Sequence, residues 1–146
     1  MKFLNYRFLS WFLCLFITFQ CERPKNVQLS YLNGYWEIDF IQQEKETFYP
    51  KSVTPLYDFY YIKDSTGFLN KAAPNRHGKY EVSKDRIPFK IVYENNIPYL
   101  RFDSRWDSWD EKISQLDSTK LILEHNDRKY HYKRPLTITI HEFREE

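Results

Sequence analysis

Turn signals recur along the chain at intervals of roughly ten residues, and apolar and polar side chains alternate in the segments between them. In the segment 34–43, for example, Trp36, Ile38 and Phe40 alternate with charged residues. This spacing is typical of antiparallel hairpins, because parallel strands need a crossover of a dozen or more residues. The sequence therefore predicts an all-β chain, and no segment after residue 20 carries a helical stripe.

Strands are predicted near residues 34–43, 56–63, 66–72, 78–83, 87–94, 97–103, 106–115, 119–125 and 128–134. About eight or nine short meandering strands predict a single small up-and-down barrel, which closes its own edges, with a sandwich as the alternative. The segment from Leu136 to Phe143 also alternates. We expect residues 136–146 to form a last edge strand or a tail on the barrel.

The first twenty residues have the pattern of a signal peptide. Lys2 and Arg7 precede an uncharged apolar run, Phe8 to Phe19. That run is too short for a transmembrane helix, which needs roughly 20 residues. We therefore expect an export signal helix over 1–20, a flexible polar tether over 21–30 and a folded domain over 31–146.

Cys21 directly follows this leader, in the pair Gln20-Cys21. The arrangement resembles a bacterial lipoprotein signal, in which the cysteine after the apolar run is acylated and becomes the mature N-terminus. The resemblance implies a lipid such as palmitate on Cys21, a membrane anchor and a place in the cell envelope, at the outer membrane. A secreted protein without the lipid is the alternative, since Thr18-Phe19-Gln20 lacks the small residue usual before that cysteine.

Composition argues against several functions. The chain has 22 Lys+Arg and 20 Asp+Glu, and loss of Lys2 and Arg7 with the leader would leave equal numbers, so we expect no nucleic-acid partner. Both cysteines precede the domain, which excludes a disulfide or a cysteine nucleophile within it. The four histidines lack metal-site spacing and no serine lies in a G-x-S-x-G elbow. We expect no enzyme activity, metal or cofactor.

The predicted first strand opens with a G-x-W motif, Gly34-Tyr35-Trp36. Following an export leader and preceding a run of meandering strands, this motif resembles the start of the lipocalin-like domain of small bacterial lipoproteins. The resemblance implies that Gly34 lets the chain enter the barrel and that Trp36 plugs its closed end. It also implies a basic side chain from the final strand over the tryptophan, here Arg134 or Lys133.

The chain is rich in aromatic residues, with 12 Phe, 12 Tyr and 4 Trp, and alternation assigns several of them to the barrel interior. The predicted lining is Phe40, Phe59, Tyr61, Tyr80, Phe89, Tyr93, Phe102, Tyr130 and Tyr132. These rings either fill the barrel or line a pocket for a small hydrophobic molecule, and phenolic hydroxyls favour the pocket because each needs a partner. We predict a membrane-anchored binding protein. The alternative is a non-enzymatic accessory protein with a solid barrel and an envelope protein partner.

Trp106 and Trp109 form a second feature. Three residues apart, they face opposite sides of a strand, so one is expected in the core and the other at the surface. An exposed tryptophan among Asp and Arg suits a glycan-binding surface, which is a third hypothesis. The competing interpretation is that both tryptophans are structural.

Overall fold

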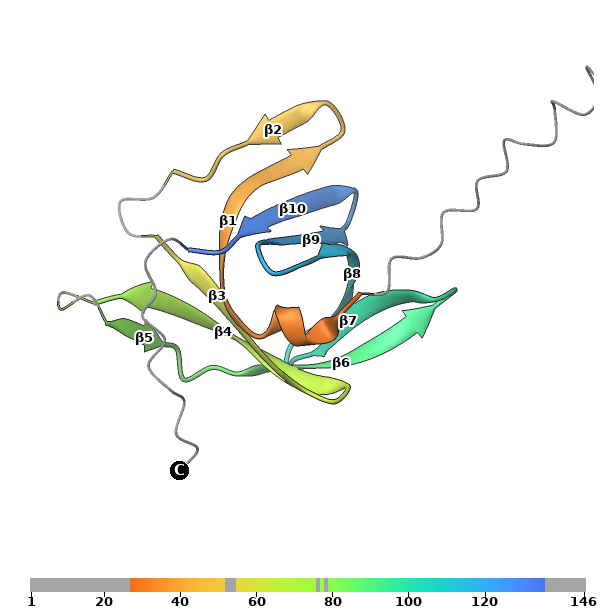
Figure 1. Cartoon of the computed structure of the whole chain (residues 1–146), viewed down its shortest axis with the longest axis horizontal. Coiled ribbons are helices and arrows are strands. Elements are labelled where there is room, and N and C mark those ends of the chain that lie inside the picture. The colour runs from red at the N-terminus through yellow and green to blue at the C-terminus, as the bar shows by residue number, and fades with distance from the viewer. Residues whose placement is uncertain (1–26, 52–54, 76, 78, 136–146) are drawn as a thin grey trace, which may run out of the picture.

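The computed structural model describes residues 27–51, 55–75, 77 and 79–135 (Figure 1). The predictions for the leader, for Cys21 and for residues 136–146 lie outside these residues. Within the described ranges, no helix has the length and apolar character needed to cross a bilayer.

The described chain begins with a 3₁₀ helix, η1, and continues as ten strands. Their bounds are η1 (Leu29–Leu32), β1 (Gly34–Gln43), β2 (Glu46–Phe48), β3 (Tyr57–Lys63), β4 (Thr66–Pro74), β5 (Tyr80–Val82), β6 (Ile87–Glu94), β7 (Ile97–Asp103), β8 (Ser108–Leu116), β9 (Lys120–His125) and β10 (Arg128–Lys133). The turn-bounded segments of the sequence predicted most of these elements. The short strand β2 and the helix η1 were not predicted.

The sheet closes on itself. Its strands follow the order β10-β9-β8-β7-β6-β4-β3-β1, and β10 pairs back onto β1, which makes an antiparallel eight-stranded barrel. The short strands β2 and β5 pair with β1 and β4 outside this ring (Figure 1). The predicted all-β up-and-down barrel is confirmed, and the sandwich alternative is wrong because no ring strand keeps an open edge along its whole length.

Turn residues fix the register of the hairpins. The β6–β7 turn has positive φ at Asn95 and Asn96, and the β9–β10 turn at Asn126 and Asp127. Two-residue hairpin turns whose twist matches the strands require this conformation, which Asn and Asp tolerate better than other side chains. In these two hairpins, the turn signals in the sequence are the positions where the backbone enters the left-handed region.

An apolar cluster occupies the barrel interior. Its most enclosed side chains are Trp36, Tyr60, Phe102, Leu32, Leu100, Leu121 and Leu123. Leu32 comes from η1, and Val27 and Leu29 pack against the same cluster. The folded part of the chain therefore begins before residue 31, inside the range predicted as a tether.

A β-bulge in β1 places Phe40 on the outside. In the pairing of β1 with β10, Ile38 lies opposite Tyr132 and Phe40 opposite His131, so the register shifts at Asp39. Phe40 stacks on His131 with 4.1 Å between ring centroids. The prediction that Phe40 lines the interior is wrong, because an extra residue in one strand inverts the alternation beyond it.

The side chains of strand β3 face the opposite sides of the sheet from those predicted. Trp36 faces inward and pairs with Asp58, which puts Asp58 and Tyr60 inside and Phe59 and Tyr61 outside. The predicted inward orientation of Phe59 and Tyr61 is wrong, because both faces of this strand are aromatic and hydrophobicity alone does not choose between them.

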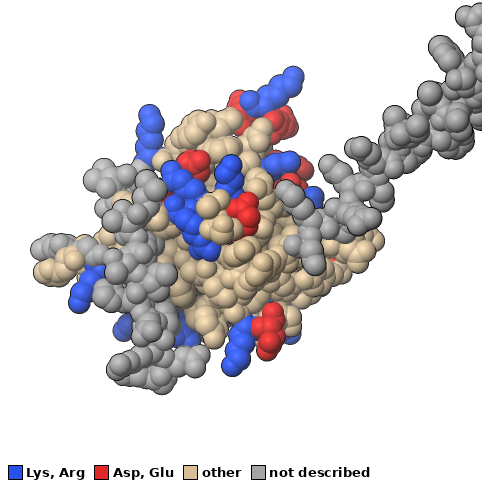
Figure 2. All heavy atoms as spheres, viewed as in Figure 1, with Lys and Arg blue, Asp and Glu red and all other residues tan. Residues whose placement is uncertain are grey.

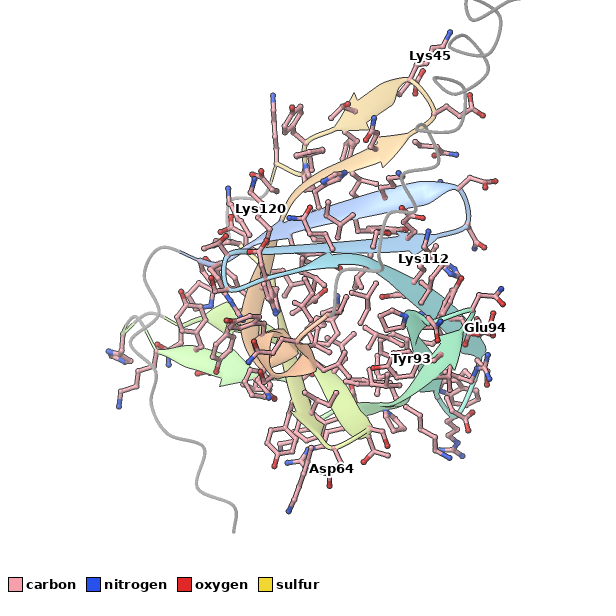
Figure 3. The ribbon with its side chains drawn as sticks, turned by 45° about the vertical axis from the view of Figure 1, so that its right-hand side comes forward. Lys45, Asp64, Tyr93, Glu94, Lys112 and Lys120 are labelled. Carbon is pink, nitrogen blue, oxygen red and sulfur yellow. The ribbon has the colours of Figure 1, made fainter. Side chains whose placement is uncertain are left out.

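Two further lining predictions fail for local reasons. Tyr80 lies on the short strand β5 and packs against Tyr57, on the outer side. Tyr93 lies near the tip of the β6–β7 hairpin and is 60% exposed (Figure 3). The hairpin extends beyond its neighbours there, so an inward-facing position has nothing to pack against.

Arg134 closes the end of the barrel at Trp36. Its guanidinium carbon lies 3.6 Å from the centre of the indole ring, and the group donates to the carbonyls of Tyr31, Tyr35 and Ser118. The indole N–H of Trp36 donates to the carbonyl of Leu32 at 2.8 Å. The cation therefore ties the entry of β1 to the exit of β10 and to the β8–β9 turn.

Gly34 makes this close approach feasible. Its φ is +106°, and a Cβ added there would lie 3.2 Å from Nη1 of Arg134. A side chain at this position would be strained and would crowd the cation. Gly34, Trp36 and Arg134 thus lie together as the lipocalin-like resemblance implied. Lys133 instead pairs at the surface with Asp39 at 2.8 Å.

We predict that Arg134→Ala lowers the free energy of unfolding by about 3 kcal/mol, because a desolvated cation–π contact and several carbonyl hydrogen bonds are lost. Lys133→Ala is the matched control and should cost less than about 1 kcal/mol, as is usual for an exposed ion pair. Urea unfolding followed by tryptophan fluorescence measures both. Equal losses in the two variants would contradict the assigned role of Arg134.

Candidate functional site

The two ends of the barrel differ. Strand directions alternate around the ring, so one end collects the last residues of β1, β4, β7 and β9 and the first residues of β3, β6, β8 and β10. We call this end the mouth, and Gln43, Ser108 and His125 mark it. At the opposite end Trp36 lies under Arg134 next to η1.

Burial varies among the inward-facing side chains. Leu32, Trp36, Leu100, Leu121 and Leu123 are fully buried. Five other inward-facing side chains are only half-buried: Ile38, Ile41, Trp109, Glu111 and Tyr130. The two groups meet within the barrel, since Leu100 lies opposite Glu111 and Leu123 opposite Tyr130.

Asp58 forms the centre of a polar cluster inside the barrel. It is 4% exposed, accepts a hydrogen bond from the hydroxyl of Tyr132 at 3.1 Å and pairs with the ammonium group of Lys71. The Lys71 side chain is 46% exposed, so the cluster extends from the core to solvent. Burial raises the pKa values of Tyr60 and Tyr132 well above the ordinary value, and the charge of Asp58 adds to this effect.

Glu111 brings a second carboxyl group into the interior. It lies on β8 opposite Leu100 and accepts a hydrogen bond from the indole N–H of Trp109 at 3.0 Å. Burial raises the pKa of Glu111 and outweighs the hydrogen bond from Trp109, which lowers it. The negative charge of Asp58 adds to the rise, whereas His125 and Lys71 act in the opposite direction. This carboxyl group keeps its proton to a higher pH than an exposed glutamate.

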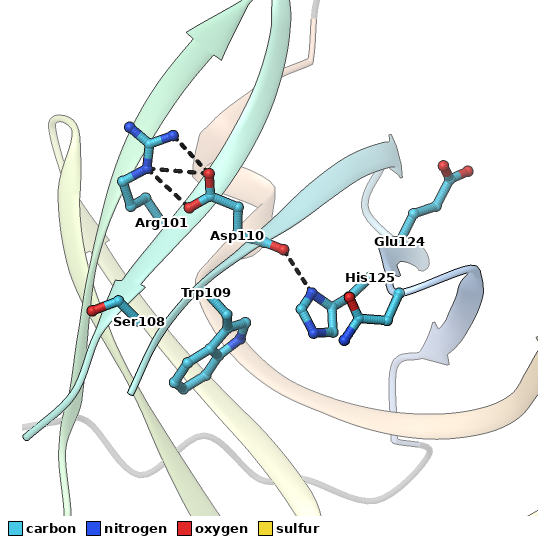
Figure 4. Close-up of a pocket in the computed structure, with 7 residues that line it drawn as sticks. Arg101, Ser108, Trp109, Asp110, Glu124 and His125 are labelled. Atoms are coloured by element: carbon cyan, nitrogen blue, oxygen red, sulfur yellow. Dashed lines mark hydrogen bonds and ion pairs between the residues drawn. The ribbon is translucent and has the colours of Figure 1, made fainter. Parts of the chain in front are cut away.

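A cleft opens at the mouth between the start of β8 and the β9–β10 turn (Figure 4). Its volume is about 510 Å³, and its lining is Arg101, Ser108, Trp109, Asp110, Glu124, His125 and Asn126. The pairing of β9 with β8 ends at Lys112 and Glu124. Residues 108–111 therefore have no paired strand on that side, and the cleft lies there.

The walls of the cleft are polar on the outside and aromatic toward the interior. On the outer side Arg101 forms a two-pronged ion pair with Asp110, with distances of 2.9 and 2.6 Å. Nδ1 of His125 lies 2.9 Å from the carbonyl oxygen of Asp110. Toward the interior, Trp109 stacks on Phe102 with 4.7 Å between ring centroids. The arrangement offers an aromatic surface next to hydrogen-bonding groups.

A second groove of about 510 Å³ lies on the outer face of β4, β6, β7 and β8. Pro88, Lys90 and Asp103 line it, together with Arg101 and Ser108, which also border the cleft. On the face that Figure 2 shows, basic side chains lie beside acidic ones. Surface pairs such as Lys129 with Glu124 agree with that mixture.

Only part of the predicted lining meets inside the barrel. Phe89, Phe102 and Tyr132 belong to the buried cluster, and Tyr130 packs against it. The interior groups that alternation missed are Asp58, Lys71 and Glu111. A signal for Asp58 was present, since it is the one charged residue in the aromatic run 57–61.

The two tryptophans of the β7–β8 region have separate environments. Trp106 lies in the turn, is 86% exposed and carries the guanidinium of Arg105 over its ring at 5.0 Å. Trp109 is half-buried on Phe102. One of the pair is thus at the surface and the other packs inward; the glycan-binding hypothesis itself stays a prediction.

Comparisons with known proteins give two solved structures of similar shape. One is a lipocalin-like protein from Bacteroides uniformis, with 13% identity, a TM-score of 0.43 and coverage of 71% of this chain and 98% of that one. The other is an uncharacterized protein from Bacteroides eggerthii, with 13% identity, a TM-score of 0.44 and coverage of 71% and 99%. No family model matches the chain, and no curated protein is similar to it in sequence.

Metal-ligating side chains do not gather in the described ranges: no group of three or more His, Cys, Asp or Glu there is placed to hold an ion.

We predict that Glu111 makes stability depend on pH. Its folded pKa lies above the ordinary value of 4.5, so the folded chain binds more protons and the free energy of unfolding falls as the pH rises from 4.5 through the folded pKa. Glu111→Gln keeps the acceptor for Trp109 and should lose most of this fall. Urea unfolding between pH 4 and pH 8 measures it.

The matched control for that experiment is Glu94→Gln, at an exposed glutamate that accepts from Arg101. Its pH profile should follow the wild type. A Glu111→Gln profile that also follows the wild type would show that the carboxyl group is not desolvated.

Proposed function

We propose that this chain is a non-enzymatic binding protein that holds a small hydrophobic molecule in the mouth of its barrel. The observation that carries the proposal is the group of inward-facing side chains that are only half-buried, which includes Ile38, Ile41 and Tyr130. A protein interior normally covers such side chains. Side chains either fill the interior of an eight-stranded barrel or leave room there for one small ligand, and the partial exposure of these three side chains favours room for a ligand.

The polar groups of the interior favour one kind of ligand. Asp58 and Lys71 compensate each other's charge, which leaves Glu111 as the interior carboxyl group with which the described residues form no ion pair. An anionic head group would meet this carboxyl group in a poorly solvated site. The proposed ligand therefore has an apolar body and a neutral or cationic head that donates hydrogen bonds.

Competition with a fluorescent probe tests this proposal. N-phenyl-1-naphthylamine should gain emission when mixed with the protein, and dodecylamine should displace it at a concentration at least tenfold lower than dodecanoate. Glu111→Gln should reduce that preference, while Glu94→Gln should leave it unchanged. Absence of any probe binding, or a preference for dodecanoate, would contradict the proposed site.

Native mass spectrometry of the protein purified from its own cells gives an independent test. A bound small molecule should appear as a constant mass increment that disappears on denaturation. If no molecule co-purifies and no hydrophobic probe binds, the barrel is not a carrier of small molecules.

The second candidate is an accessory protein that presents its surface to an envelope protein partner. The large exposed ring of Trp106, in the β7–β8 turn beside the mouth, favours it. Exposed tryptophans are enriched among the residues that dominate protein interfaces. Trp106→Ala should abolish capture of the partner under this hypothesis and should leave probe binding unchanged under the first.

We further propose that the protein is exported and anchored in the cell envelope through a lipid on Cys21. The leader and the cysteine that follows it support this proposal. Growth with a radioactive fatty acid should label the wild type and not the Cys21→Ala variant, which should leave the membrane fraction. Absence of label in the wild type, or equal label in the variant, would refute the anchor.

A further inference from the structure

The cleft beside β8 combines one aromatic ring with hydrogen-bonding side chains, and Trp109 supplies the ring (Figure 4). Phe102 stacks on one face of the indole at an interplanar angle of 12°. The indole N–H donates to Glu111. The ring is therefore held in one position, and the part of it that borders the cleft is apolar.

The ionised side chains of the lining have opposite charges beside them. Arg101 pairs with Asp110 at 2.6 Å. Glu124 lies 3.1 Å from the ammonium group of Lys112 and 3.3 Å from that of Lys129. Because these charges compensate one another, they give an ionic ligand little attraction, and the cleft favours a neutral occupant.

His125 presents a hydrogen-bond acceptor to that occupant. Its Nδ1 lies 2.9 Å from the carbonyl oxygen of Asp110, along the dashed line in Figure 4. A carbonyl oxygen only accepts, so Nδ1 carries the hydrogen, and in the neutral ring Nε2 is then an acceptor. A ligand group that meets Nε2 must donate a hydrogen bond.

Asn126 adds an amide group, which both donates and accepts. It is the first residue of the β9–β10 turn, has a φ of +49° and lines the cleft. Hydroxyl groups also donate and accept, so a ligand with several hydroxyl groups can satisfy both His125 and Asn126.

We propose that the cleft binds a neutral sugar ring, a hexopyranose. One side of such a ring is a surface of C–H bonds that can pack on Trp109, and its hydroxyl groups can reach His125 and Asn126. The cleft volume of about 510 Å³ lies in the range of small-molecule sites, roughly 300–1,000 Å³. The proposal assigns the glycan hypothesis to Trp109, since Trp106 does not line this cleft.

Two sources share this chemistry: a free sugar, and the head group of a glycolipid whose apolar body enters the barrel. Only the second source rests on the proposed function. The cleft itself is tested with sugars that have no apolar body.

NMR titration of the full chain with the methyl glycosides of glucose, galactose and mannose tests the cleft, in a zwitterionic detergent without a sugar head. At least one glycoside should shift the indole signal of Trp109 and the side-chain amide signal of Asn126, and leave the indole signal of Trp36 in place. The expected Kd is about 1–10 mM, as for a small neutral ligand in an open cleft. Absence of both shifts with all three glycosides at about 100 mM overturns the proposal.

Two glycine variants give a matched comparison. Asn126→Gly removes the amide and suits the positive φ of the turn. Asn95→Gly makes the same change at the first residue of the β6–β7 turn, where φ is +51°. The first variant should weaken glycoside binding at least fivefold, and the second should leave it within twofold of the wild type. Unchanged binding in both, or equal loss in both, overturns the proposal.

His125→Asn tests the acceptor. The asparagine amide keeps a donor for the carbonyl of Asp110 but lacks Nε2, so binding of the same glycoside should weaken at least fivefold. Binding equal to the wild type would show that Nε2 does not contact the sugar, and would overturn the assigned role of His125.

Octyl glycosides distinguish the two sources. If the sugar is a lipid head group, the octyl glycoside of the preferred sugar should displace N-phenyl-1-naphthylamine at a concentration at least tenfold below that of tetraethylene glycol monooctyl ether. Asn126→Gly should remove this advantage. Equal displacement by the two octyl compounds would show that the cleft takes free sugars.

Failure of this proposal and failure of the proposed function give different results. If the naphthylamine probe does not bind but a methyl glycoside does, the binding function of the barrel interior is contradicted and the sugar site stands. If the probe binds and no methyl glycoside does, the sugar site alone is overturned.

Discussion

The pairing of β10 with β1 is the constraint on which the rest of the structure depends. It converts a meander with two open edges into a ring, and open edges are otherwise a liability for a small sheet. Arg134 secures the same junction from the end, because its guanidinium lies over Trp36 and donates to carbonyls of η1, β1 and the β8–β9 turn. The β10–β1 pairing that closes the ring and the Arg134–Trp36 contact that covers one end of the barrel therefore depend on the same junction.

Closing one end leaves the mouth as the place where the interior meets solvent. The floor is built from fully buried apolar side chains such as Leu121 and Leu123. Other inward positions hold Asp58, Glu111 and half-buried apolar groups, and a cleft of about 510 Å³ opens at the mouth. The proposed binding function follows from these polar and half-buried inward positions.

Hairpins were predictable from sequence because their signals are local. Turn residues such as Asn95-Asn96 report a backbone conformation directly, and the segments between turns have the period of strands. The roles of Gly34 and Trp36 were predictable only through resemblance, since the cation that explains both comes from residue 134, at the far end of the domain.

The orientation of individual strands was less predictable. A bulge at Asp39 inverted β1 beyond Ile38, and no residue type signals such a bulge. In β3 both faces are aromatic, so the choice between Phe59 and Tyr60 depends on tertiary pairing with β1. The interior carboxyl groups of Asp58 and Glu111 were missed because an acidic residue in a strand normally faces solvent.

The central claim, that a ligand enters at the mouth, is tested most directly by the indole N–H signals in an NMR titration. The described tryptophans occupy three distinct places: Trp36 at the floor, Trp106 in an exposed turn and Trp109 at the mouth. On addition of dodecylamine, the Trp109 signal should shift and the signals of Trp36 and Trp106 should stay in place. A titration in which Trp109 does not move, or in which only Trp106 moves, would contradict the account.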